Sequence, residues 1–395
     1  MIINEKRKSK IMRLLIVPMS AMAETSGPFS RCSLLAESAA EAGIDVATCI
    51  AEDVNYSEIC GIKNYFLDVP APLGMPEIIA SNVFPVAQKL GITSRKTVKS
   101  FDEVLRLTGN SVYSYLVKSV ASVRRAIRSF KPDVVYSEFS IPAMIAAKLE
   151  KKKLFTTVSY PTQPEYANSP KLAKGVNRYL NEKKLPQVKC VLELFDWADE
   201  CFCPSIHELE PIEKENVAFC GALKNINTSE RLRDKIVVYM GNGTVSAGLT
   251  ERELGKAFSG SEYEVYIASK YLKAKNTGHI HIAPRWDFNE LLDEAVLFIN
   301  HGGQNSVVDG LLHGVPQMIV PGKVFERRYN AVSVAKNKAG IIIPHRQFRA
   351  DIIRSKADKV INSEKMRRNA AELGKKLSSQ GGIDIIIKRI LNYDI

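Results

Sequence analysis

The sequence is short of the features that mark membrane, disulfide-rich and nucleic-acid-binding proteins. No apolar run approaches the roughly 20 residues of a membrane-spanning helix. The seven cysteines form no CxxC pair and lack the spacing of a metal site, and their odd number argues against a disulfide framework. We expect them to be small buried side chains in a reducing cytoplasm. The basic residues are scattered and no nucleic-acid-binding motif accompanies them, so nucleic acid is not an expected partner.

The formal net charge of +12 still favours an anionic partner, such as a sugar nucleotide or an anionic membrane face. The helical segment Lys171–Lys189 is basic. A solvated helix face is the simpler interpretation of this segment, and a seat for an acidic acceptor or an anionic lipid surface is the alternative. The charge alone does not decide between them.

The first residues imitate a signal peptide, because basic Lys6–Lys10 precedes the apolar stretch Ile11–Met22. Arg13 and Pro18 interrupt that stretch. The same residues serve better as the first strand of an α/β domain, so we expect no cleaved leader and a cytoplasmic location.

Strand and helix patterns alternate along the chain, which predicts an α/β fold with doubly wound parallel sheets. Arg13–Val17 and Ile44–Thr48 are the first two strands, with a helix between them, and Ile236–Met240 begins a second such series. A chain of 395 residues is long enough for two cores. We expect an N-terminal domain at residues 1–223, a linker at 224–234, a C-terminal domain at 235–375 and a last helix within 376–395.

The segment from residue 295 to residue 330 predicts a strand, a sharp turn, a helix and another strand. Ala295–Ile299 is an unbroken apolar run, His301-Gly302-Gly303 breaks it, and Asn305 or Ser306 is expected to cap the helix that follows. Val315–Val320 returns as the next strand. The free N–H groups and the positive dipole end of such a helix attract an anion such as a diphosphate. A Gly-rich turn without a ligand is the alternative.

Two further stretches are candidates for the same ligand. Gly243 and Thr244 follow the strand Ile236–Met240, and their amides and hydroxyl would complete a diphosphate cradle, although this loop alone is a weak signal. Trp286 and Phe288 supply aromatic rings on which a nucleotide base would stack. A tryptophan that belongs to the core is the competing interpretation.

The segment HGGQNSVVDGLLHGVPQMIVPGKVFERRYNA resembles the nucleotide-sugar signature of inverting glycosyltransferases of the UDP-glycosyltransferase and macrolide-glycosyltransferase superfamily. Bacterial members are the most similar in character. The resemblance implies the GT-B fold, in which two Rossmann-like domains face a central cleft, the region from Val69 to Phe130 covers the acceptor, and the last helix crosses back to the first domain. It is strong in the second half of the chain and weak in the first.

The resemblance also implies roles for individual residues. His301, Gly302, Gly303, Asn305 and Ser306 would hold the donor diphosphate. Three more residues match the end of the signature: Glu326 would hold sugar hydroxyls, Arg327 stands where the family usually has glutamine, and Asn330 matches the asparagine of the following helix. The family's Trp-x-Pro-Gln is reduced here to an aromatic pair. The donor would be a UDP- or dTDP-sugar, used as a substrate, without a cofactor or a metal. The acceptor would be a hydroxyl-bearing small molecule or a lipid, and a homodimer is left open.

The sequence departs from the family at the catalytic base. In the relatives a Gly-His pair follows the first strand, and a later carboxylate orients that histidine. Here Gly27 matches the glycine, Pro28 stands at the histidine position, and Glu138 matches the carboxylate. We expect Glu138, or else Glu24, to act as the base, because an unpaired carboxylate in a crevice can have a raised pKa. An acceptor acidic enough to need little help, and lost transfer activity, are the alternatives.

Two other functions fit the same fold. An NDP-sugar epimerase would act without an acceptor, and a catalytically silent protein would bind a sugar nucleotide or regulate a partner enzyme. Product analysis with a labelled NDP-sugar separates these functions from sugar transfer.

Overall fold

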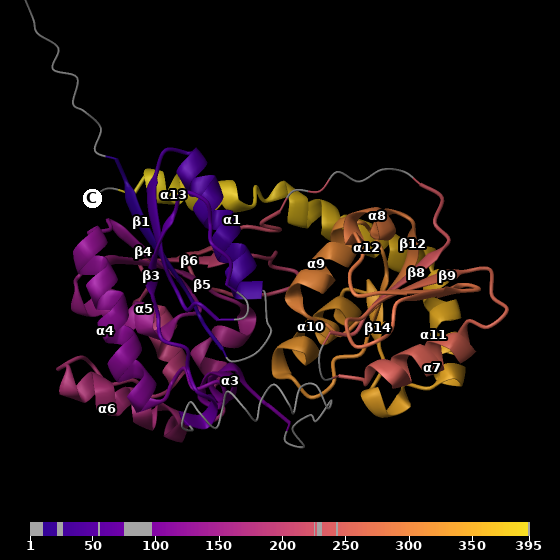
Figure 1. The fold of residues 1–395 in the computed structure, drawn as a ribbon, viewed down its shortest axis with the longest axis horizontal. Helices are drawn as coiled ribbons and strands as arrows, with labels where there is room; N and C mark the ends of the chain where they lie inside the picture. The colour runs from indigo at the N-terminus through magenta and orange to yellow at the C-terminus, as the bar shows by residue number, and fades with distance from the viewer. Residues whose placement is uncertain are drawn as a thin grey trace, which may run out of the picture.

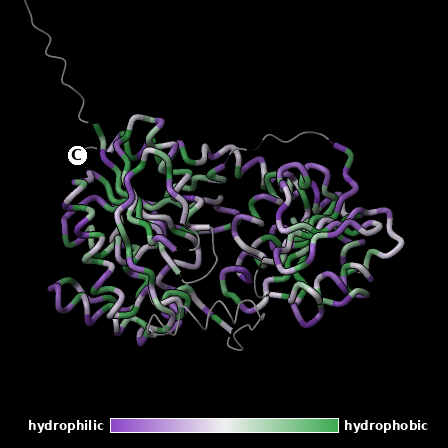
Figure 2. Tube along the Cα trace, in the orientation of Figure 1, coloured by the Kyte–Doolittle hydropathy of each residue, from purple (hydrophilic) through white to green (hydrophobic). Residues whose placement is uncertain are grey.

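The computed structural model describes residues 11–21, 27–53, 56–74, 97–224, 226, 231–241 and 244–393. These residues form two α/β lobes side by side, each with helices on both faces of a central sheet (Figure 1). The expected α/β class with two doubly wound parallel sheets is confirmed. In the hydropathy view, apolar residues concentrate along the strands in the middle of each lobe (Figure 2).

The first sheet is parallel throughout, and its two central strands are almost wholly buried, as expected where helices cover both faces of a sheet. In spatial order its strands are β3 (Lys63–Phe66), β2 (Asp45–Ile50), β1 (Arg13–Pro18), β4 (Val134–Glu138), β5 (Lys153–Thr157), β6 (Glu200–Cys203) and β7 (Val217–Phe219).

Two groups of helices cover this sheet. One face packs against α1 (Gly27–Glu41) and α13 (Ile383–Leu391). The other face packs against α3 (Phe101–Leu107), α4 (Tyr113–Phe130), α5 (Ile141–Leu149) and α6 (Lys174–Glu182), directly or through one another.

The second sheet is parallel except for one short edge strand, β10. Its spatial order is β10 (Lys275–Thr277), β11 (Ile280–Ala283), β9 (Glu264–Ala268), β8 (Lys235–Tyr239), β12 (Ala295–Asn300), β13 (Gln317–Ile319) and β14 (Gly340–Ile342). The strand expected at Val315–Val320 is thus confirmed only over its middle three residues.

One face of the second sheet packs against α7 (Ala247–Ala257) and α11 (Ala350–Ile361). Four helices lie on the other face: α8 (Phe288–Asp293), α9 (Gln304–Leu312), α10 (Phe325–Lys336) and α12 (Glu364–Ser379). In Figure 1, α9 and α10 are the helices of this lobe that face the first lobe.

The last helix leaves the second lobe and lies on the first. Ile386, Ile387 and Ile390 of α13 are buried in the same apolar cluster as Leu14 of β1 and Leu35 of α1. Figure 1 shows α12 and α13 running along one edge of the molecule from the second lobe to the first. The exact domain boundaries stay a prediction.

All seven cysteines are free thiols, and all except Cys60 are buried. Burial raises the pKa of the Cys49 thiol to about 12, which keeps it protonated and unreactive. Within the described ranges, no helix has both the length and the apolar character needed to span a membrane.

Candidate functional site

The turn after β12 is fixed from both sides. The Asn300 side chain accepts a hydrogen bond from the Gly302 amide at 2.8 Å, and the Asn330 side chain donates to the Gly302 carbonyl at 2.9 Å. Gly302 has a φ of +82°, and a Cβ there would lie 2.7 Å from the Arg327 carbonyl oxygen. Only glycine fits, so a rigid turn delivers the chain to α9. In this structure Asn330 positions the turn.

Helix α9 begins at Gln304, with Gly303 as its N-cap residue and no side-chain cap. The prediction that Asn305 or Ser306 caps this helix is wrong, because both residues lie inside its first turn. Asn305 is exposed there and Ser306 is buried. Without a side-chain cap, the first amides of α9 stay available to an outside acceptor such as a phosphate.

His301 fills the space between two glycine loops. A Cβ on Gly303 would lie 2.6 Å from its Nε2, and one on Gly241 would lie 3.1 Å from its ring. Its Nδ1 is 3.4 Å from the Tyr239 carbonyl oxygen, so Nδ1 carries the proton that it donates. Burial, with the nearby Arg327 charge, lowers the pKa of His301 to about 3. The imidazole is therefore neutral near pH 7 before any anion binds.

The start of α10 brings Arg327 and Glu326 to the same place. Arg327 donates from a terminal guanidinium nitrogen to the Thr244 hydroxyl at 2.9 Å, which joins α10 to the loop after β8. Gly322 has a φ of +63°, and a Cβ there would lie 3.1 Å from the Thr244 methyl group. Glu326 is exposed, and its charge acts on Arg31 of α1 across the two lobes. Gly243 lies outside the described residues.

Trp286 and Phe288 are half-buried beside the core of the second sheet. Trp286 donates its indole N–H to the Ile267 carbonyl at 3.1 Å, and its ring meets Tyr266 edge-on. Phe288 lies 5.6 Å from Tyr239, measured between ring centroids, and Tyr239 in turn lies 5.3 Å from His301. Phe288 is thus linked to the His301 turn, whereas the anchored Trp286 has a structural role in any case. Base stacking on either ring stays a prediction.

The first lobe contributes an ion pair that the sequence reading did not anticipate. Arg31 of α1 donates to Glu138 at the end of β4, with Nε 2.6 Å from Oε1 and a terminal nitrogen 2.5 Å from the same oxygen. Oε2 of Glu138 accepts a hydrogen bond from the Thr157 hydroxyl, and the Glu138 side chain is 2% exposed. The premise of an unpaired Glu138 is therefore wrong. Glu24 lies outside the described residues, and both base assignments stay predictions.

A second carboxylate, Glu210, was also missed. It is buried in the loop between β6 and β7, where it accepts from the Tyr160 amide at 2.6 Å and from the Gln304 side chain at 3.3 Å. Burial, with the added repulsion of Glu326, raises the pKa of Glu210 to about 7. Gln304 is the first residue of α9, so Glu210 connects the first lobe to the start of the candidate anion-binding helix.

The same loop docks the two lobes beside the site. The Leu209 carbonyl accepts from the Tyr329 hydroxyl at 2.8 Å and from the Ser333 hydroxyl at 2.7 Å, both on α10. Tyr160 of the first lobe stacks on Tyr329 with 5.0 Å between ring centroids. Leu209 also joins the apolar cluster of α9, α10 and α12. The relative position of the lobes is thus set next to the candidate site.

We expect Glu210→Gln to stabilise the protein by an amount that grows from about pH 4.5 and is complete above about pH 7. The folded-state pKa is about 7 against an ordinary 4.5, so the folded protein binds more protons between these values and loses stability as pH rises through them. Removing the charge should raise the free energy of unfolding by about 3 kcal/mol at pH 8 and change little at pH 4. Urea unfolding at both pH values measures this. The exposed Glu215→Gln is the control, and an equal effect of the two variants would contradict the prediction.

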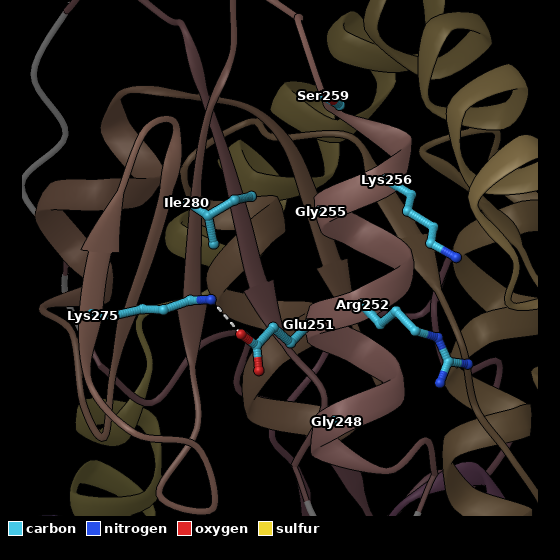
Figure 3. Close-up of a pocket in the computed structure, with 8 residues that line it drawn as sticks. All are labelled: Gly248, Glu251, Arg252, Gly255, Lys256, Ser259, Lys275 and Ile280. Carbon is cyan, nitrogen blue, oxygen red and sulfur yellow. Dashed lines mark hydrogen bonds and ion pairs between the residues drawn. The ribbon is translucent and has the colours of Figure 1, made fainter.

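One groove of the described residues lies away from these groups. It has a volume of about 580 Å³ and runs between α7 and the β10–β11 edge, where Lys275 pairs with Glu251 across it (Figure 3). None of the predicted site residues lines it. Nor do the described residues contain a group of three or more His, Cys, Asp or Glu side chains that would hold a metal ion.

Comparison with known proteins finds similar sequences for part of the chain and similar folds for nearly all of it. Residues 270–392 match the family model described as erythromycin biosynthesis protein CIII-like, C-terminal domain. The uncharacterized UDP-glucosyltransferase YdhE of Bacillus subtilis is 28% identical over 170 residues, which are 41% of this chain and 42% of that protein. UDP-glucuronosyltransferase 3A1 of Xenopus laevis is 30% identical over 146 residues, 35% of this chain and 28% of that protein.

The chain is thus similar in sequence, over part of its length, to proteins named as UDP-glycosyltransferases. Its matched stretches span less than half the length of these two relatives. Solved structures extend the likeness of fold to nearly the whole chain. CalG4, the calicheamicin glycosyltransferase, has a TM-score of 0.74 at 14% identity and covers 97% of this chain and 98% of its own. The glycosyltransferase of kitacinnamycin has a TM-score of 0.73 at 14% identity, with 97% and 99% covered. The fold is therefore GT-B.

Of Arg31 and Glu210, the two site residues that were not predicted, only Arg31 could have been found from its spacing in the sequence. Arg31 lies one helical turn after Gly27 on α1, so it shares a face with the position where relatives carry their histidine. Glu210 gave no comparable signal, because only the docking of its loop against α9 makes it a site residue.

Proposed function

We propose that the chain is an inverting, metal-independent glycosyltransferase that moves a sugar from a UDP- or dTDP-sugar to a small-molecule acceptor. The observation that supports this most is the uncapped start of α9, held behind the rigid His301–Gly303 turn and beside Arg327. Amides and a helix dipole aimed at one point stabilise a leaving diphosphate, which is the task that a metal performs in other folds.

Similar proteins support two donor nucleotides, uridine diphosphate and thymidine diphosphate. Relatives of matching sequence are named for UDP-sugars, whereas the solved neighbours SpnG and VinC were crystallised with thymidine diphosphate. A thermal-shift panel of nucleoside diphosphates and NDP-sugars tests the proposal. A ligand at 100 times its Kd should stabilise the native state by roughly 2.7 kcal/mol. A panel without any shift would count against the proposal.

We expect Glu326→Ala to weaken the binding of the NDP-sugar while leaving that of the free NDP nearly intact. Glu326 is exposed at the start of α10, where it can reach sugar hydroxyls. A carboxylate at this helix position would also favour the dipole by ~0.3–1 kcal/mol without touching a sugar. Calorimetric titration of both ligands measures the difference. Equal losses of affinity for NDP and NDP-sugar would leave Glu326 as a dipole partner only.

Product analysis with a labelled NDP-sugar distinguishes transfer from the two other activities of this fold. Transfer yields a glycosylated acceptor, an epimerase changes the sugar without any acceptor, and a silent binder returns the donor intact. SpnG was also crystallised with the spinosyn aglycone, which favours an acceptor that is a small organic molecule.

The proposal includes a cytoplasmic location, since all seven thiols are free. Contact with an anionic membrane is its least supported part. The exposed basic residues Lys171, Lys174 and Arg178 lie in and before α6, but Arg178 already pairs with Glu182. Sedimentation with anionic vesicles tests this contact, and light scattering after gel filtration tests the homodimer.

A further inference from the structure

A permanent cation lies close to Pro28, the position to which the resemblance assigns the catalytic base. Helix α1 begins with Gly27 and Pro28, and Arg31 lies on the same face one turn later. One terminal nitrogen of Arg31 lies 3.7 Å from the position of a Cβ on Gly27. Proline offers no side-chain base, and a guanidinium does not give up its proton in a protein. Among the described residues, the side chains at this helix start can stabilise an anion, and neither Pro28 nor Arg31 can remove a proton.

The carboxylates near Arg31 are poorly placed to replace the missing base. Glu138 is buried behind the guanidinium, with one oxygen held by Arg31 and the other by Thr157. Glu210 is buried, with its oxygens held by Tyr160 and Gln304. Glu326 belongs to the second lobe. Asp53 lines a small cavity with Pro28 and already interacts with another group.

Apolar and aromatic side chains also lie near Arg31, beside the carboxylates that act on its charge. The group lies 5.9 Å from the centroid of the Phe139 ring, while Glu138 holds its other side. Phe29 and Pro28 line the small cavity at the start of the same helix. The Arg31 side chain keeps 16% of its surface exposed, against 2% for Glu138, so Arg31 is the more accessible member of the ion pair.

We propose that the acceptor is a carboxylic acid with an apolar body, already ionised at neutral pH, and that Arg31 binds its carboxylate. This inference rests on the proposed function and names its substrate class. One carboxylate oxygen forms a bond to the anomeric carbon of the donor sugar, while the bond from that carbon to the diphosphate oxygen breaks. The diphosphate leaves with the electron pair, no proton has to be removed, and the product is an ester glycoside.

Matched pairs of acceptors test the inference. Benzoate is compared with benzyl alcohol, and cinnamate with cinnamyl alcohol, using UDP-glucose and dTDP-glucose as donors. Hydroxylamine identifies the bond, because it converts an ester glycoside to a hydroxamate and leaves an ether glycoside intact. We expect kcat/KM to be at least roughly 100-fold higher for the acids, since a charged hydrogen-bonding group left without its partner costs about that factor. Higher rates with the alcohols would overturn the inference.

The pH profile gives a second measurement. Glu138, Cys32 and Glu326 act on the charge of Arg31, and Arg31 acts on Glu210. With an acid acceptor, kcat should stay level from about pH 6 to 9, because no base takes part. A rate that rises through a pKa and loses that dependence in Glu24→Gln, Glu210→Gln or Asp53→Asn would show a carboxylate base and contradict the inference.

Variants of Arg31 locate the effect. Arg31→Lys keeps the charge beside Glu138 but loses the paired N–H donors, so it should raise the KM for benzoate roughly 10–100-fold and leave the Kd for UDP unchanged. The exposed Arg354→Lys is the matched control. If Arg31→Lys folds poorly, Arg31→Gln/Glu138→Gln removes both charges and should give the same loss. An unchanged KM would overturn the role of Arg31.

Calorimetry with UDP and dTDP distinguishes a failure of the proposed function from a failure of the acid acceptor. If neither nucleotide binds, the proposed function fails and the acceptor class fails with it. If a nucleotide binds and only alcohols are glycosylated, the proposed function stands and the acid acceptor is wrong.

Discussion

Arg31→Met is expected to lower the free energy of unfolding by about 3–5 kcal/mol, because it leaves the Glu138 carboxylate buried without its cation. Glu138 keeps only 2% of its side chain exposed, and Arg31 is the sole cation with which it forms an ion pair among the described residues. Urea unfolding at pH 7.5, followed by circular dichroism, measures the change. Thr157 can still donate one hydrogen bond to Glu138, but it brings no compensating charge.

A second substitution distinguishes the buried charge from a loss of packing. Arg31→Met/Glu138→Gln removes the unpaired charge and should recover most of the lost stability. The matched control is Arg354→Met, whose Asp358 partner is exposed and whose loss should cost no more than ~1 kcal/mol. If Arg31→Met were as mild as this control, or if Glu138→Gln failed to rescue it, the ion pair would not be a buried electrostatic unit.

His301→Ala is expected to reduce kcat/KM by roughly 10²–10³-fold without unfolding the protein, the usual cost of losing one preorganised partner of developing charge, ~2.7–4 kcal/mol. The ring fixes the space between Gly241 and Gly303, the two loops that would meet the diphosphate. It reaches this role as a neutral group, since its pKa is lowered to about 3. Steady-state kinetics with saturating and with limiting donor measure the loss.

The neutral state of His301 adds a test of its own. Between pH 5 and pH 8 the imidazole of the free protein does not titrate, so the affinity for UDP should show no step due to His301 in this range unless bound phosphate raises its pKa. Calorimetric titrations of UDP into wild type and His301→Ala at pH 5 and pH 8 show whether the affinity changes with the protonation of His301. The exposed His207→Ala serves as the control. Full activity of His301→Ala would contradict the assignment of this turn to the donor.

Much of the candidate donor site could be predicted because its residues are neighbours in the sequence. The apolar run of β12, the glycines of the turn and the helix after it are local features, and each appeared where expected. The helix cap was wrong because Gly303 itself adopts the extended backbone of an N-cap residue, so Asn305 and Ser306 enter the helix. The geometry of the turn therefore outweighed the tendency of Asn and Ser to cap a helix.

The carboxylates near the expected base position were harder to predict, because their partners lie far away in the sequence. The reading of Glu138 as an unpaired carboxylate depended on what lies opposite it, and that residue is Arg31, 107 positions earlier in the chain. Glu210 likewise acquires its raised pKa only through burial beside Tyr160 and Gln304, the latter from the other lobe. Charges separated by a hundred residues leave no periodic pattern in a sequence, so their pairing cannot be inferred from spacing.

The sequence by itself determined the two doubly wound sheets, since runs of buried apolar residues alternate with helices, and it determined the glycine turn at His301–Gly303, where a φ of +82° at Gly302 admits no side chain. Only the tertiary structure decided which carboxylates are buried and which groups they meet. Docking Leu209 and Tyr160 against Tyr329 brings Glu210 to the start of α9, and packing α1 on the first sheet brings the Arg31 guanidinium to Glu138. Burial then raises the pKa of Glu210, because the energy of a charge depends on its surroundings far more than on its neighbours in the chain.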